Sequence, residues 1–256
     1  MTNEKRHGAR RDIPERTSPE VPPTGSDAGV HFFETWGRTN RFVGAILKPV
    51  EAITGLQRQR ASLPSEAAKL VPEGDALSGF FGAGGTVLWE VVFCRHVDNF
   101  QAYLAHLLRD VLPRKPELVN EMKFTTDVGK LVAGATDGAF SIDVQALLRE
   151  KIEKKVRSFA YGSFAELHKF MAKRLGLPVG TPQQLQFVDR AIQTRNISVH
   201  NRGMVNGARM QVLRPHVRVL TATLSVMVAD LDRMAIDLNE LFENPIEGVT
   251  AKPLWP

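Results

Sequence analysis

The sequence predicts an all-α protein, and three observations support that prediction. Apolar residues recur at intervals of three and four along several long segments, which is the spacing of one helix face. No segment alternates apolar and polar residues as a half-buried strand does. Prolines and glycines stand between the periodic segments, where helices begin and end. Together these features predict an antiparallel, up-and-down helical bundle.

The periodic segments divide the chain into four parts. Residues 1–29 are polar, proline-containing and nearly free of large apolar residues, so we expect a disordered tail, with an RNA-binding arm as the alternative. Residues 30–85 are expected to form an extra N-terminal helical region that ends in a glycine-rich connector. Residues 86–243 are expected to form the main helical domain, and residues 244–256 an irregular tail.

In the N-terminal region, the apolar spacing predicts a helix over residues 30–60, which Pro49 kinks or splits. A short helix is expected over residues 64–71. The connector contains the run Gly82-Ala83-Gly84-Gly85-Thr86, but it lacks the lysine and the preceding strand of a phosphate-binding loop. We therefore interpret the connector as a flexible hinge between helices.

The main domain is expected to begin with a long helix over residues 86–112, in which Cys94 belongs to the apolar core. Two further helices are expected over residues 123–133 and 143–159. The second of these is strongly basic. It is interpreted either as a solvated outer face with ion pairs along the helix or as an RNA-binding ridge.

Helix-end signals divide the rest of this domain. Ser163 and Glu166 have the spacing of a capping box, and Gly176 is expected to end the helix that they begin. Thr181 and Pro182 then supply an N-cap and a first-turn proline. The residues of this next helix expected to face the core are Leu185, Val188, Ile192 and Val199. A last helix over residues 215–242 is expected to pack lengthwise on the helix over 86–112.

The helix that follows Pro182 carries the run Arg195-Asn196-Ile197-Ser198-Val199-His200. At 3.6 residues per turn, Asn196 and His200 lie on one face, whereas Arg195 is rotated from His200 by about 140°. Histidine titrates near neutral pH, and the arginine guanidinium matches the geometry of a phosphate. These side chains can move a proton and hold a phosphate without a metal.

The charges around this run are uneven. Between Val179 and Leu220 every basic residue other than histidine is an arginine, and Asp189 is the only acid. A cluster of arginines without lysines is better explained by bidentate phosphate binding than by a general requirement for a soluble surface. The residues expected to bind RNA or phosphate are Arg190, Asn201, Arg202, Arg209 and Arg214.

The run resembles the Arg-Asn-x-x-x-His signature of the HEPN superfamily, and the resemblance covers roughly residues 86–242. It implies a HEPN-type bundle and a metal-independent endoribonuclease with a 2′,3′-cyclic phosphate product. It also implies a homodimer in which both signatures face one composite site, with Arg195, Asn196 and His200 as catalytic residues. Bacterial members of the superfamily commonly act in toxin–antitoxin pairs or in defence against phage. The resemblance therefore also implies an antitoxin or a defence-system partner protein.

Two features bear on this interpretation. An acidic residue often lies on the first core helix of the family, but Gln101 occupies the likeliest position here and Asp98 lies three residues earlier. HEPN-like domains also serve as nucleotide-binding or protein-docking modules. The alternative function is therefore a non-catalytic module within a larger defence complex, in which the signature residues form a structural hydrogen-bond cluster.

Composition agrees with a cytoplasmic protein that has an anionic partner such as RNA. The formal net charge is +5 and the pI is about 9.5. The single cysteine excludes an intramolecular disulfide and favours a reducing compartment. No apolar run is long enough to span a membrane, and no secretory signal is recognised, so we expect no membrane association. Histidines are scattered without ligand spacing, so no metal and no cofactor are expected.

Overall fold

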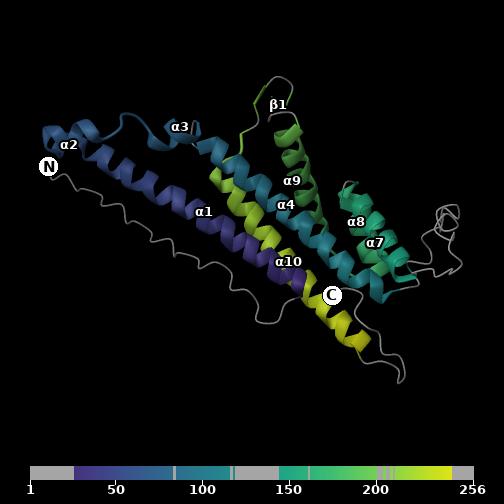
Figure 1. Ribbon diagram of the computed structural model, residues 1–256. Coiled ribbons are helices and arrows are strands. Elements are labelled where there is room, and N and C mark those ends of the chain that lie inside the picture. The colour runs from purple at the N-terminus through teal and green to yellow at the C-terminus, as the bar shows by residue number, and fades with distance from the viewer. Residues whose placement is uncertain are drawn as a thin grey trace, which may run out of the picture.

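The computed structural model describes residues 26–82, 85–115, 118, 144–160, 162–200, 204–205, 208–209 and 211–243. Within these ranges helices joined by turns and loops make up the protein, with one small hairpin besides, which confirms the all-α class (Figure 1). The long helices are α1 (Asp27–Arg58), α4 (Thr86–Val111), α7 (Val144–Ala160), α9 (Pro182–His200) and α10 (Arg214–Glu243). The short helical elements are η1 (Arg60–Ser62), α2 (Ser65–Leu70), α3 (Ala76–Phe81), η3 (Leu112–Arg114), α8 (Phe164–Phe170) and the π-helical turn η4 (Met171–Leu175).

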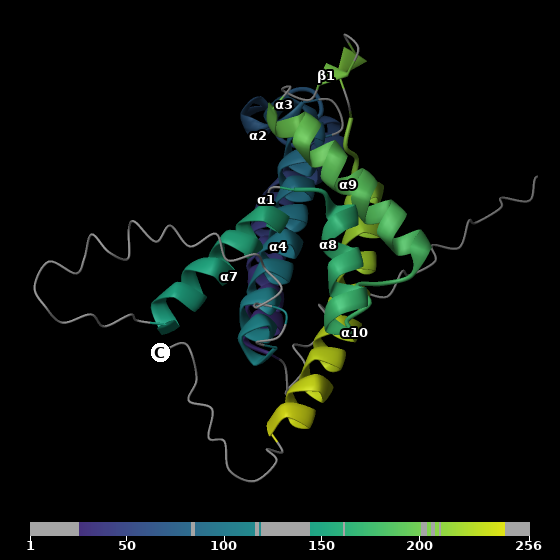
Figure 2. The same cartoon turned by 90° about the vertical axis from the view of Figure 1, so that its right-hand side faces the viewer.

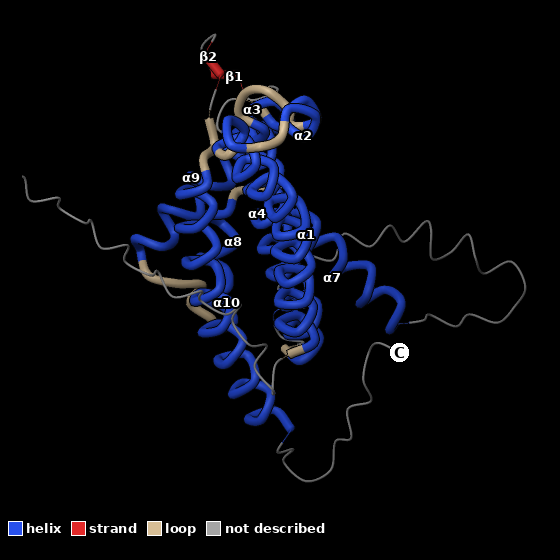
Figure 3. Tube along the Cα trace, turned by 90° about the vertical axis from the view of Figure 1, so that its left-hand side faces the viewer, coloured by secondary structure: helices blue, strands red, loops and turns tan. Residues whose placement is uncertain are grey.

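Some sequence expectations lie outside these ranges. Residues 1–25, the expected helix over 123–133 and the expected tail over 244–256 are not among the described residues. The hairpin, in contrast, was not expected from the sequence. It pairs β1 (Met204–Val205) with β2 (Ala208–Arg209) in antiparallel register beyond the end of α9 (Figure 3). Strands of two residues are too short to show alternation, so the sequence pattern could not reveal them.

Helix α4 is the centre of the bundle and contacts α1, α7, α9 and α10 (Figures 1 and 2). Its buried side chains include Phe100, Tyr103, Leu104 and Leu107, which belong to one continuous core with residues of the surrounding helices. Burial of this apolar surface is the main driving force that holds the helices together. The sequence placed this helix correctly to within one residue.

The contacts of α4 show the direction of its neighbours. Trp36 of α1 packs on His96, and Phe32 packs on Tyr103, so α1 runs antiparallel to α4. On another side, Tyr103 Oη donates a hydrogen bond of 3.5 Å to the Val228 carbonyl oxygen of α10. Helix α10 lies along α4, as the sequence predicted (Figure 1).

The first turn of α1 is fixed to α10. Asp232 is buried, and its carboxylate accepts hydrogen bonds from the Ser26 backbone N–H, at 3.0 Å, and from the Ser26 hydroxyl. The same hydroxyl accepts a hydrogen bond from the Gly29 N–H and thereby caps the helix. Helix α1 therefore begins at Asp27, three residues earlier than expected, and its first half belongs to the same core as α4.

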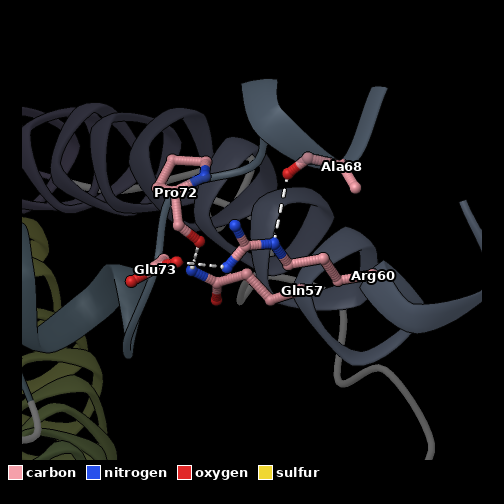
Figure 4. Close-up of polar contacts among 5 residues, drawn as sticks. All are labelled: Gln57, Arg60, Ala68, Pro72 and Glu73. Atoms are coloured by element: carbon pink, nitrogen blue, oxygen red, sulfur yellow. Dashed lines mark hydrogen bonds and ion pairs between the residues drawn. The ribbon is translucent and has the colours of Figure 1, made fainter. Parts of the chain in front are cut away.

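Val43, Ile46 and Leu47 of α1 still pack against this core, and the end of the helix continues beyond it with α2 beside it (Figure 1). The helix continues through Pro49 without interruption, so the expected split does not occur. Arg60 binds α2 and the segment that follows it. Its Nε donates a hydrogen bond to the Ala68 carbonyl oxygen at 3.1 Å, and its Nη1 forms an ion pair with Glu73 Oε1 at 2.9 Å (Figure 4). Gln57 adds a hydrogen bond of 2.7 Å to the Pro72 carbonyl (Figure 4).

The connector differs from its predicted form. The segment interpreted as a flexible hinge contains α3, whose N-cap Asp75 accepts a hydrogen bond of 3.0 Å from the Leu77 N–H. An N-cap of this kind stabilises even a short helix, and the glycine-rich composition concealed it.

Candidate functional site

Helix α9 carries the Arg-Asn-x-x-x-His run, and a reciprocal capping box fixes where the helix begins. The Thr181 N–H donates to Gln184 Oε1 at 2.8 Å, and the Gln184 N–H donates to Thr181 Oγ1 at 3.3 Å. The capping box expected at Ser163 is absent: Ser163 occupies the N-cap position of α8 without a side-chain hydrogen bond. From Pro182, nineteen helical residues bring the chain to His200.

Arg195 is held by an ion pair from α4. Its Nε donates to Asp98 Oδ1 at 2.7 Å, and its Nη1 donates to Asn196 Oδ1 at 3.1 Å. A guanidinium has five N–H donors, so three of them have no hydrogen bond to a described residue and can bind an anion. The Asp98 carboxylate also restricts the rotamers of Arg195, because both partners lie on helices that are packed together.

Asn196 and His200 are exposed, one turn apart on the same face of α9. No hydrogen bond or ion pair joins His200 to Arg195 or Asn196 within the described part of the chain. The structure therefore brings Arg195 and Asn196 together with Asp98, and it leaves the imidazole accessible at the end of the helix.

An open groove runs beside this cluster, between the first half of α4 and the end of α9. Its lining residues are Val87, Glu90, Val91, Cys94, Arg95, Asp98, Ser198 and Val199. Val91 is 58% exposed and Val199 is 51% exposed. Val199 was expected to face the core, and its exposure shows that expectation to be wrong, because none of the described elements covers this part of α9.

Cys94 also differs from its predicted place. It is half-buried and lines the groove, although the sequence suggested a core residue. Burial raises the pKa of its thiol, and the nearby carboxylates of Asp98 and Glu90 act in the same direction. The Ser198 hydroxyl next to the thiol lowers the pKa in part, although Ser198 Oγ has no hydrogen bond of normal geometry among the described residues.

Of the residues expected to bind RNA or phosphate, the structure describes the side chains of two, and these lie on different helices. Arg190 is exposed on α9, whereas Arg214 lies over the Trp89 ring at 5.7 Å, in a different groove between α1 and the start of α4. Asn201 and Arg202 lie outside the described residues, and only the backbone of Arg209 is described, in β2. Arg214 is thus not part of the Arg195 cluster.

The sequence did not indicate that Asp98 contacts Arg195. The resemblance to the HEPN signature pointed to position 101, but the Gln101 side chain lines a separate pocket with Phe159 and Phe164. The available signal was helix phase: Asp98 shares a stripe with Val87, Val91 and Cys94, and that stripe faces α9.

Comparison with known proteins adds no identification, since no family model, curated protein or solved structure matches this chain. Among the described residues, no three or more histidine, cysteine, aspartate or glutamate side chains are grouped so that they could hold a metal ion. None of the helices described is both long enough and apolar enough to cross a membrane.

Proposed function

We propose that this chain is a HEPN-type, metal-independent endoribonuclease that cleaves RNA through attack of the ribose 2′-hydroxyl. The observation that carries the proposal is the Arg195–Asp98 ion pair beside an exposed Asn196 and an exposed His200. This arrangement supplies a fixed positive charge and an accessible imidazole at one end of α9. Both are needed for phosphodiester cleavage without a metal.

Each side chain has a role in this reaction. His200 takes the proton from the 2′-hydroxyl or donates one to the leaving oxygen. Arg195 stabilises the negative charge that grows on the phosphate, with Asp98 as the positioning residue that holds its guanidinium. Asn196 orients His200 or binds a phosphate oxygen.

A homodimer completes the proposed site. On one α9 helix Arg195 and His200 are separated by about 140° of rotation, and no bond joins them in the described structure. Two α9 helices facing each other would place His200 of one protomer near Arg195 of its partner. In this proposal the protein acts in the cytoplasm as a toxin or an anti-phage effector, and an antitoxin or another defence protein restrains it.

The test is cleavage of total RNA and of labelled oligonucleotides in the presence of EDTA. The wild-type protein is expected to cleave RNA, and His200→Ala to abolish cleavage while the circular dichroism spectrum stays the same. Arg218→Ala is the matched control, because Arg218 is an exposed arginine from the same arginine-rich segment but belongs to α10. Full activity of His200→Ala, or complete inhibition by EDTA, would contradict the proposal.

One observation favours the second candidate, a non-catalytic nucleotide-binding or protein-interaction module. Arg195 already uses two donors within the chain, as expected of a residue that joins two helices structurally. In that case neither the wild-type protein nor the His200→Ala variant cleaves RNA, and Asp98→Asn lowers stability without any effect on an activity.

A further inference from the structure

We propose that the α4–α9 groove holds the nucleobase of the nucleotide whose phosphate lies at Arg195. This inference rests on the proposed function and assigns the groove as its base-binding subsite. The groove and the ion pair share one residue, since Asp98 lines the groove and also binds Arg195. A phosphate at the free side of the guanidinium therefore places the attached nucleoside next to the groove.

The size and the lining of the groove suit a base. Its volume is about 540 Å³, within the range of roughly 300–1,000 Å³ that is typical of small-molecule sites. Val87, Val91 and Val199 supply exposed apolar walls. Exposed apolar side chains that gather in one groove mark a binding surface rather than a solvated one. The face of an unstacked base is apolar in the same way, and single-stranded RNA exposes its bases.

Polar groups at the margins of the groove can meet the edges of a base. The guanidinium of exposed Arg95 carries five N–H donors, and the carboxylate of Asp98 is a hydrogen-bond acceptor. Arg95 lines the same groove and lies one turn from Val91. Apolar walls for the face of the base and a few polar groups for its edges are the usual composition of a specific small-ligand site.

Cys94 makes this proposal directly measurable, because it is the only cysteine of the chain and it lines the groove. Alkylation of the full-length protein by N-ethylmaleimide therefore reports on one position. Adenosine or cytidine 3′-monophosphate is expected to slow the reaction, whereas inorganic phosphate is not. At a nucleotide concentration about ten times Kd the rate should fall roughly tenfold, because only the unoccupied protein reacts.

Matched tryptophan variants test whether the groove itself is responsible. Val91→Trp fills the groove, so it should remove the protection by nucleotides and lower kcat/KM for RNA. Val219→Trp is the control, because Val219 is 54% exposed on α10 and does not line the groove. Val199→Trp and Val226→Trp form a second pair, each at a valine that is 51% exposed, should Val91→Trp fold poorly.

The outcomes separate this inference from the proposed function. RNA cleavage by the wild-type protein without nucleotide protection of Cys94 overturns the base subsite and leaves the nuclease standing. Nucleotide protection of Cys94 in a protein that cleaves no RNA supports the groove as a nucleotide site and contradicts the proposed nuclease function. Equal protection by inorganic phosphate, or alkylation that slows with protein concentration alone, overturns the inference. The last result would mean that a second copy of the chain covers the groove.

Discussion

Asp98 Oδ1 lies 2.7 Å from Arg195 Nε, so one ion pair joins the middle of α4 to the last turns of α9. Both side chains are only half-buried, and pairs of this kind contribute at most about 1 kcal/mol to stability. The contact therefore matters more for the direction of the guanidinium than for the fold.

Asp98→Asn is expected to reduce RNA cleavage by about tenfold to a hundredfold, because a misdirected guanidinium stabilises the transition state poorly. The free energy of unfolding should change by less than about 1 kcal/mol. Single-turnover cleavage and urea unfolding measure the two effects. Glu153→Gln is the control, since it removes the Arg109–Glu153 ion pair between α4 and α7, and it should leave cleavage unchanged. Equal cleavage by Asp98→Asn and the wild-type protein would exclude a positioning role.

Gly29→Ala is expected to destabilise the protein by about 2 kcal/mol, although alanine is the better helix former. A Cβ at this position would lie 2.5 Å from Asp232 Oδ2, so the buried carboxylate would have to leave Ser26. At Gly44, in the same helix, an added Cβ would meet no atom within 4 Å other than those of the adjoining helix backbone, so Gly44→Ala should stabilise the protein by about 1 kcal/mol. Urea unfolding of both variants measures the change in the free energy of unfolding. A change of the same sign in the two variants would contradict the prediction.

Thr181→Ala should cost about 1 kcal/mol, because it removes one half of the capping box of α9. Ser163→Ala should cost much less, since its hydroxyl makes no cap hydrogen bond in α8. Thermal unfolding of the two single variants distinguishes them. An equal loss of stability in Ser163→Ala and Thr181→Ala would show that Ser163 caps α8, as the sequence pattern predicted.

Stability should fall as the pH drops from 6.5 toward 4, in part because of His96. Burial lowers the pKa of His96 to about 4, so the folded protein keeps this imidazole neutral while the unfolded chain takes up a proton. The contribution of neutral His96 to the free energy of unfolding is fully present above pH 6.5. At pH 5 this contribution is smaller by about 2 kcal/mol. His96→Phe removes the titration beside Trp36, so its free energy of unfolding should depend less on pH. Urea unfolding at pH 7.5 and 5.0 measures the difference, and equal pH dependence would refute it.

The helices could be predicted from the sequence because their signals are local. Apolar spacing located α1, α4 and α10, and Gly176 ends the π-helical turn in the left-handed conformation that glycine favours. Helix phase also showed that Asn196 and His200 share a face.

The uncovered surfaces could not be predicted, because periodicity identifies an apolar face without showing whether another element covers it. Phe42, Val91 and Val199 all fit a helical stripe, yet they are exposed because none of the helices that the structure describes covers them. The partnership of Asp98 with Arg195 depends on how α4 packs against α9, across 97 positions of sequence. Such a contact becomes visible only in three dimensions.

The attachment of Ser26 to Asp232 spans 206 positions of sequence. During synthesis the N-terminal end of α1 leaves the ribosome long before Asp232 is translated. Any chain released before that residue lacks the acceptor for the Ser26 hydrogen bonds, so the first turn of α1 cannot be attached to α10 until residue 232 has been translated.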